Sequence, residues 1–319
     1  MITRKLGPKR IALLFLTLSF FVASSLYAQT RPQLDIHQIE NLTGAKGEFE
    51  GESGLIKVTV PHTELKVNSM GVKLTPALGL ASEISFQPLA SEVEMTGKVI
   101  LFEDQVNFAL KTALDHDLNI TALHNAYLWD APRVMVLYIE GKGTGQSLAT
   151  AVGQVFDMIK KTSKGTIWGV SPPPLNRTRS TLDPKTIEAI LETKGIALKD
   201  GSYKLTWDKT NPIGKETWAV FSGTDKQAAL FGDFAIPEDR VQNVLKALLK
   251  HNLFIISLHQ NSKGDGPKDI VVHYMGRGSL MDLSKALKEA LDCLQPEAIE
   301  PKNKGGLVSK KARKGQSPT

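Results

Sequence analysis

The sequence has only one cysteine, Cys293. A single thiol excludes both a disulfide framework and a thiolate metal cluster. Because no cysteine follows the apolar stretch near the N-terminus, we also expect no lipid anchor there. The chain lacks the GxSxG, HExxH and CxxC motifs as well. No familiar hydrolase, metalloprotease or redox centre is therefore indicated.

Long hydrophobic runs are scarce too. The longest, Ile11–Val22, is a mainly apolar stretch of 12 residues, which is short of the roughly 20 that a membrane span needs. Basic residues precede this run and small residues follow it, as in a secretory signal. We therefore predict a signal peptide over residues 1–28, cleaved at Ser25 or Ala28, and a periplasmic or extracellular protein. An uncleaved anchor is the alternative.

The body of the chain lacks an excess of charge of either sign. The formal net charge is +6, but four of the 39 basic residues lie in residues 1–28 and six in residues 295–319. Residues 29–294 are close to neutral, which excludes nucleic-acid binding through the body. The stretch 295–319 is predicted to be a basic, disordered tail. It is either solvated or in contact with anionic lipid or cell-wall polymer.

What the chain does have is an internal repeat. The second half repeats the first at an offset of 135 residues, so that His124 recurs as His259 and Asp130 as Asp265. No gap is needed across the region that holds these pairs. A duplicated unit is one fold written twice, so matched positions are constrained by that fold. Mismatched polar positions indicate where the copies have specialised.

The two copies show the same pattern of elements. Asp35 and Asp183 precede apolar residues at helical spacing, which is typical of a capped helix start. Strands with alternating apolar and polar residues follow in both copies. The pattern predicts an α+β fold of two tandem homologous units, each a mainly antiparallel sheet backed by helices, related by a pseudo-twofold axis. The units span residues 29–161 and 183–294, joined by a proline-rich linker, residues 162–182.

A pair of strands in each copy carries the histidines. A hairpin turn centred just before its proline would place His124 opposite Tyr138 and, in the second copy, His259 opposite His273. Opposed residues share a face with Cβ atoms about 5 Å apart. Two imidazoles so placed can hold one divalent transition metal, with Asp265 at the hairpin tip as a third ligand. The alternative is a pair of hydrogen-bonded histidines that serve only the fold.

Each unit closes with glycine, a cation and a hydroxyl before a helix, in Gly141–Thr144 and Gly276–Ser279. A helix N-terminus with these residues suits an anion, and an ordinary turn is the alternative. Arg133 and Lys268 follow the turn prolines of the two hairpins. They can add positive charge for an anionic ligand, or they are outward-facing strand residues.

Several segments together resemble the LppY/LpqO family of secreted bacterial proteins: Val72–Leu80, Thr121–Asn125, Pro132-Arg133 and Gly141–Gly143. The resemblance covers most of the chain that follows the signal. It implies a duplicated protein that is often lipid-anchored and has no established activity.

Relatives in that family resemble TALHNH, with an acidic residue before Pro-Arg and a histidine before GxG. The matching positions here are His124, Ala126, Asp130 and Tyr138, and in the second copy His259, Asn261, Asp265 and His273. The chain departs from the pattern at Ala126, Asn261 and Tyr138, and it lacks the lipobox cysteine. If the histidines of the relatives bind metal, this chain has lost several ligands.

These observations predict an exported bacterial envelope protein that acts as a ligand- or metal-binding module for a small molecule. The predicted ligand-binding residues are His124, Asp130, Arg133 and Lys268, and the predicted metal ligands are His259, Asp265 and His273. No catalytic residue is assigned. The alternatives are a metal-assisted hydrolase, in which the metal activates water, and a purely structural envelope protein.

Overall fold

The computed structural model describes residues 32–162, 179–207, 217–261 and 269–294. The predicted signal peptide, the basic tail and most of the linker lie outside these ranges. So do two predicted site residues, Asp265 and Lys268.

The described part of the first unit has three α helices around a run of antiparallel strands. Its elements are α2 (Ile36–Thr43), β1 (Lys46–Glu50), β2 (Leu55–Pro61), β3 (Asn68–Ser69), β4 (Val72–Lys73), η1 (Pro76–Leu78), β5 (Ala81–Pro88), β6 (Val93–Phe102), η2 (Glu103–Gln105), α3 (Val106–Asp115), β7 (Asn119–Asn125), β8 (Asp130–Ala131), β9 (Val134–Gly143) and α4 (Gly145–Thr162).

The second unit repeats this order, without counterparts of β3, β4 and β8 among its described elements. Its elements are α5 (Pro184–Leu191), β10 (Ile196–Ala197), β11 (Tyr203–Trp207), β12 (Thr217–Gly223), β13 (Ala228–Pro237), η3 (Glu238–Arg240), α6 (Val241–Lys250), β14 (Phe254–Asn261), β15 (Asp269–Gly278) and α7 (Leu280–Asp292). The predicted α+β class is confirmed.

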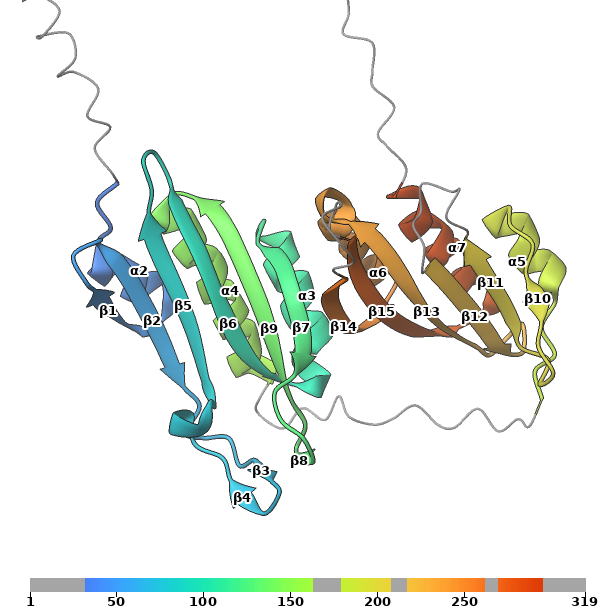
Figure 1. Cartoon of the computed structure of the whole chain (residues 1–319), viewed down its shortest axis with the longest axis horizontal. Helices are drawn as coiled ribbons and strands as arrows, with labels where there is room; N and C mark the ends of the chain where they lie inside the picture. Colours follow the sequence, from blue (N-terminus) through green and yellow to red (C-terminus); the bar gives the residue numbers. More distant parts are fainter. Residues whose placement is uncertain (1–31, 163–178, 208–216, 262–268, 295–319) are drawn as a thin grey trace, which may run out of the picture.

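Both units contribute to one sheet rather than to two separate ones (Figure 1). Twelve strands run in the order β1-β2-β5-β6-β9-β7-β14-β15-β13-β12-β11-β10. Every neighbouring pair is antiparallel, and Leu123 of β7 pairs with Leu258 of β14 where the units meet. The sequence predicts two sheets lying side by side. The structure differs because β7 and β14, which lie at the inner edge of each half of the sheet, pair with each other. No free strand edge is left between the two halves.

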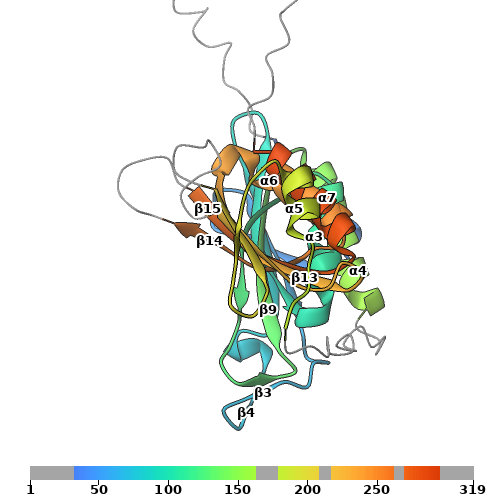
Figure 2. The ribbon, with the colours of Figure 1, turned by 90° about the vertical axis from the view of Figure 1, so that its right-hand side faces the viewer.

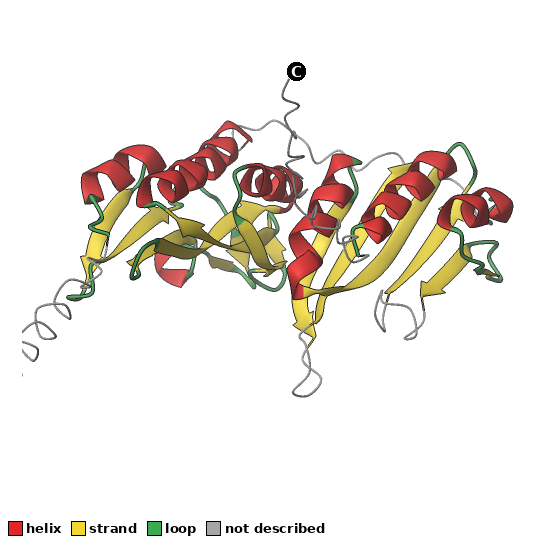
Figure 3. Ribbon diagram, turned by 90° about the horizontal axis from the view of Figure 1, so that it is seen from above, coloured by secondary structure: helices red, strands yellow, loops and turns green. Residues whose placement is uncertain are grey.

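The α helices lie along one face of this sheet (Figure 3). Their apolar sides pack on alternate residues of the strands and form one continuous core cluster that runs through both units. Burial of this apolar surface is the main contribution to stability. Figure 2 shows the helices to one side of the sheet. Because successive strand residues point to opposite faces, the other set of strand side chains points away from the helices. None of the described helices is long and apolar enough to span a bilayer.

In the first unit, a small sheet covers one end of the helix-free face. The chain between β2 and β5 forms a three-stranded sheet, in the order β4-β3-β8, together with the end of the β7–β9 hairpin. Beneath it lies a second apolar cluster formed by Val67, Leu74, Leu80, Ile100, Val134 and Val136. Strand side chains of both units form the rest of the described part of this face.

Two side-chain amides join the units in matching ways. Asn107 of α3 accepts from the backbone N of Ile255 (3.1 Å) and donates to the backbone O of Leu253 (3.3 Å). Gln242 of α6 accepts from the backbone N of Ile120 (2.9 Å) and donates to its O (3.0 Å). At the repeat offset, Asn107 matches Gln242 and Ile120 matches Ile255. Each helix therefore binds the strand of the other unit.

Candidate functional site

A row of polar and aromatic side chains crosses the helix-free face of the second unit. His259 of β14 and His273 of β15 stack with ring centroids 5.5 Å apart and an interplanar angle of 26°. The His273 Nδ1 donates to Asp233 Oδ1 at 2.5 Å. The other carboxylate oxygen, Oδ2, accepts from the indole Nε1 of Trp218 at 3.0 Å. The Lys204 ammonium lies 5.5 Å from the centroid of the Trp218 ring.

The first unit has a row at the matched positions, with different chemistry. His124 of β7 lies 5.6 Å from Tyr138 of β9, measured between ring centroids. Lys98 is paired with Tyr138 across the strands and forms an ion pair with Glu83 (3.2 Å). At the offset of 135 residues, Tyr138, Lys98 and Glu83 match His273, Asp233 and Trp218. The first copy thus has a cation where the second has the carboxylate that holds its histidine.

The predicted pairing of these rings across the strands is wrong: the observed register is shifted by two residues. His124 pairs with Val136 and His259 pairs with Val271, rather than with Tyr138 and His273. A β-bulge in each strand, between Ile120 and Ala122 and between Ile255 and Ser257, accompanies this register. A shift of two residues keeps side chains on the same face, whereas a shift of one would not. The rings therefore meet as diagonal neighbours.

The histidines of both units share one face. Leu123 and Leu258, which pair at the junction, are both buried in the helix-side core. Because successive strand residues point to opposite faces, His124 and His259 point to the helix-free side. Both are exposed. These histidines are not buried core residues, although His124 Nδ1 also donates to the backbone O of Asn125 (2.9 Å).

Asp233 and Trp218 are the residues that sequence reasoning missed. A carboxylate that accepts from Nδ1 fixes the tautomer of a neutral imidazole and leaves Nε2 as the acceptor or metal ligand. The indole N–H of Trp218 in turn holds the carboxylate in place. A signal for Asp233 was present in the repeat, since it matches a residue of opposite charge, Lys98.

An exposed apolar row lies beside the histidines on the same face. Met275 pairs with Phe231 on one side and with Phe254 on the other, two residues along β15 from His273. Phe231, Phe254 and the bulge residue Ile256 are 42%, 53% and 44% exposed. The matched residues of the first unit are all polar: Thr96, Glu140, Asn119 and Thr121. The fold therefore tolerates polar residues at these positions, and packing does not account for the apolar ones.

The remaining predicted site residues are placed apart from the histidine rows or are not described. Asp130 Oδ2 accepts from the backbone N of Val134 at 2.5 Å, so this carboxylate serves the hairpin. Arg133 is exposed and lies three residues from Val136, the partner of His124, or about 10 Å along the strand. Among the described residues, no group of three or more His, Cys, Asp or Glu side chains is arranged to hold a metal ion.

The predicted anion turns are strand ends followed by capped helices. Gly141, Lys142 and Gly143 pair with β6 along their whole length, and Lys142 Nζ lies 3.3 Å from Glu94 Oε1. The hydroxyl of Thr144 accepts from the backbone N of Ser147 (3.1 Å), and Ser279 caps α7 in the same way. The hydroxyls therefore act as helix caps.

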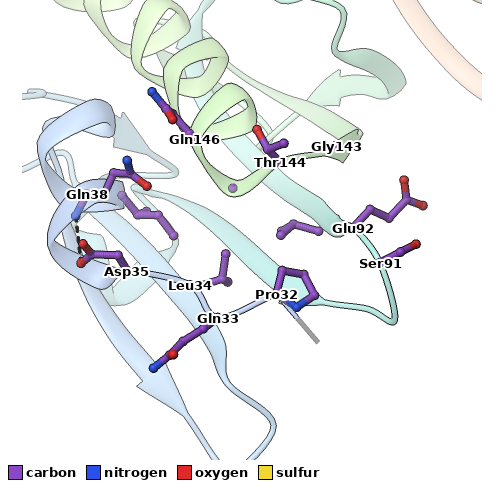
Figure 4. Close-up of a pocket in the computed structure, with 13 residues that line it drawn as sticks. Pro32, Gln33, Leu34, Asp35, Gln38, Ser91, Glu92, Gly143, Thr144 and Gln146 are labelled. Carbon is purple, nitrogen blue, oxygen red and sulfur yellow. Dashed lines mark hydrogen bonds between the residues drawn. The ribbon is translucent and has the colours of Figure 1, made fainter. Parts of the chain in front are cut away.

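Cavities lie elsewhere in the molecule. One of about 460 Å³ is lined by residues at the starts of α2 and α4 and by the β5–β6 turn (Figure 4). There Asp35 accepts from the backbone N of Gln38, and Glu92 supplies a second carboxylate to the lining. Another, of about 800 Å³, lies at the junction of the units beside Gln242 and Gln260. Neither of these two cavities includes His259 or His273.

Comparison with known proteins identifies the family of the chain. A family model described as Domain of Unknown Function (DUF1259) matches residues 37–158 and again residues 185–293. No curated protein matches the chain. A solved structure of a double-ringed trimeric shell protein from the RMM microcompartment is 11% identical, covering 65% of this chain and 84% of that one, with a TM-score of 0.17. That overlap is too low to relate the two folds.

Proposed function

The chain belongs to the DUF1259 family of domains of unknown function, and on that premise we propose that it is a ligand-binding module. Its site is the helix-free face of the second unit around His259 and His273. The imidazoles hold the polar end of a small ligand, directly or through one divalent transition metal. The row of Phe231, Met275 and Phe254 receives an apolar part of the same ligand.

The observation that carries this proposal is the difference between the two copies. Both copies keep a ring pair at the same place, but only the second adds a carboxylate that orients the histidine. Only the second lines the neighbouring row with exposed apolar residues. A fold constraint would act on both copies alike. Specialisation of one copy for a ligand accounts for both differences together.

The chemistry of the pair suits a metal that is completed from outside. Neutral imidazole nitrogen is a common ligand for zinc and related ions. The hydrogen bond from His273 to Asp233 is the kind of contact that holds a metal-binding histidine in the right orientation. With two imidazoles and no third described ligand, an ion here would keep positions for water or for the bound molecule. Asp265 stays a predicted third ligand.

A titration with Zn²⁺, followed by calorimetry at neutral pH, tests the site. We expect the chain to bind about one equivalent and the H259A/H273A variant to lose that binding. D233N should weaken binding about 10- to 100-fold, since it removes the orienting carboxylate.

The matched control is H124A/Y138A, which removes the equivalent rings of the first unit. It should bind Zn²⁺ as the unmodified chain does. Equal loss of binding in both double variants, or no binding by the unmodified chain, would show that the second unit is not a metal-dependent site.

We also propose that the two units are related by a pseudo-twofold axis through the β7–β14 junction. The reciprocal contacts of Asn107 and Gln242 support it, as does the match of one family model to two segments. Export to the periplasm or beyond remains part of the proposal and is supported by the pattern of residues 1–28. The resemblance to the LppY/LpqO proteins also stays a prediction.

A further inference from the structure

A small sheet at one end of the first unit projects from the molecule and forms a surface separate from the histidine row. The three-stranded sheet β4-β3-β8 extends beyond the end of the main sheet (Figures 1 and 2). We call residues 68–73 and 128–131 the tip. Ser69 pairs with Val72 in one direction and with Asp130 in the other, so two hairpin ends meet there.

The tip exposes large apolar side chains together. Met70 is 71% exposed, Val72 53%, Leu128 68% and Trp129 78%. Large exposed apolar residues that cluster, rather than occurring singly, mark interaction sites. The second unit has no counterpart of β3 and β4 among its described elements, and the corresponding segment, residues 208–216, lies outside the described ranges.

Backbone conformation at the tip makes this exposure more informative. Met70 and Trp129 both have positive φ, 51° and 52°, a region that favours glycine or asparagine over bulky residues. Neither side chain is buried in return. Two bulky residues thus occupy strained, exposed positions without a gain in packing, and such outliers cluster at functional sites.

The tip is held in shape by the structure beneath it. The buried cluster around Val67 and Leu74 anchors its base. The Ser69 hydroxyl donates to the backbone O of Leu128 (2.7 Å), and the Tyr127 hydroxyl donates to the backbone O of Leu78 (2.9 Å). Burial and the nearby Asp130 carboxylate raise the pKa of Tyr127, so its hydroxyl stays protonated. A preformed tip pays little ordering entropy when it binds.

Basic residues outnumber acidic ones in the segments that form and support the tip. Residues 62–80 and 125–133 contain Lys66, Lys73 and Arg133, all exposed, against the carboxylates of Glu64, which lies 3.3 Å from His62 Nδ1, and of Asp130. The Asp130 carboxylate already accepts from the backbone N of Val134. Exposed Trp and Leu side chains, with exposed Lys and Arg residues close by in the chain, match the chemistry of a membrane interface with anionic headgroups. A projecting tip, unlike a groove, can enter such an interface.

From these observations we propose that the tip inserts into the surface of an anionic lipid bilayer, with Trp129 and Leu128 in the interface and the three cations on the headgroups. This proposal does not depend on the histidine site. It orients the molecule with the β3-β4-β8 end against the membrane.

The test uses the full chain and vesicles of phosphatidylglycerol mixed with a phosphatidylcholine brominated on its acyl chains. Bromine quenches the fluorescence of tryptophans that enter the bilayer. The signal of Trp129 is the difference between the unmodified chain and W129F, which keeps an apolar ring at that site. We expect quenching of this difference signal, which pure unbrominated vesicles do not produce. The L128S/W129S variant should partition into the vesicles about tenfold less than the unmodified chain.

Every variant keeps residues 1–65 and 134–319 unchanged, so the contribution of those residues to lipid binding is the same in each comparison. K66Q/K73Q/R133Q should show a weaker preference for anionic over zwitterionic vesicles than the unmodified chain, while L128S/W129S should keep the full preference. Circular dichroism confirms that each variant is folded. Absence of Trp129 quenching would overturn the proposal. So would sedimentation of the unmodified chain as a dimer that L128S/W129S dissociates, since the tip would then bind a second copy.

Discussion

Tyr274 shows how one residue can differ between the copies at a cost in stability. It is 1% exposed, stacks on Phe234 (centroids 4.9 Å apart) and has no hydrogen-bond partner for its hydroxyl among the described residues. Burial and the neighbouring Asp233 carboxylate raise the pKa of this phenol well above its usual range. The matched residue of the first unit is the apolar Ile139. The hydroxyl therefore brings a desolvation penalty without a compensating bond.

We predict that Y274F stabilises the protein by about 1 kcal/mol, because it removes the unsatisfied hydroxyl and keeps the ring. Urea unfolding followed by circular dichroism measures the change. Y203F is the control and should destabilise, since the Tyr203 hydroxyl donates to Glu188 and accepts from the backbone N of Gly195. A loss of stability in Y274F would mean that the hydroxyl has a partner, such as a bound water.

At this scale the sequence was informative about local pairs and not about distant ones. The shared face of His124 with Tyr138, and of His259 with His273, follows from strand alternation within one hairpin. Asp233 lies 40 residues from His273 in the chain, and its pairing depends on the order of strands in the sheet. Sequence periodicity does not carry that order.

At the scale of elements, Glu289 joins the end of α6 to α7. Its carboxylate oxygens lie 2.6 Å from Lys250 Nζ and 2.6 Å from His251 Nε2. The hydrogen bond from Lys250, and after it that from His251, lowers the pKa of Glu289. A folded-state pKa below the unfolded one, about 4.3, gives stabilisation that is present above the unfolded pKa. That stabilisation is lost as the pH falls through the folded pKa.

We therefore expect E289Q to lower the melting temperature at neutral pH and to make no difference once the carboxylate of the unmodified chain is protonated. Thermal unfolding of both proteins across the acid range gives the two curves, which should converge as the pH falls. D292N is the control, since Asp292 pairs with Lys288 within α7. Curves that stay parallel at all pH values would mean that Glu289 does not link the two helices through its charge.

The long, periodic elements were predictable, and the exceptions have physical reasons. Capped helices at Asp35 and Asp183 and the alternating strands lie where expected. The edge strands β1 and β10 were missed because one is mostly polar and exposed and the other has two residues. The glycine-rich ends of β9 and β15 were predicted as turns, since glycine is typical of turns. Gly141 pairs with Met95 within the sheet. Glycine suits this strand position because a Cβ atom there would lie only 2.8 Å from Cδ2 of Leu148.

For the molecule as a whole, the junction decides whether two units behave as one. A bulge leaves backbone groups without partners in their own strand pair, and buried groups of that kind must be satisfied. In β7 and β14 the groups of Ile120 and Ile255 are bound by Gln242 and Asn107 of the opposite unit. This long-range exchange was not predictable from either copy alone, because it needs the edge-to-edge contact that only the assembled sheet provides.

We predict that N107A and Q242A each destabilise the protein by about 1–3 kcal/mol, since each deletion leaves backbone groups without a partner. Unfolding should remain a single transition, because one apolar core runs through both units and Leu123 still pairs with Leu258. Urea unfolding, with hydrogen exchange at the Ile120 and Ile255 amides, measures both effects. The exchange protection of Ile255 should fall in N107A and that of Ile120 in Q242A. No change in protection would mean that the amides do not couple the units. Two separate transitions would mean that these amides, rather than the shared core, hold the units together.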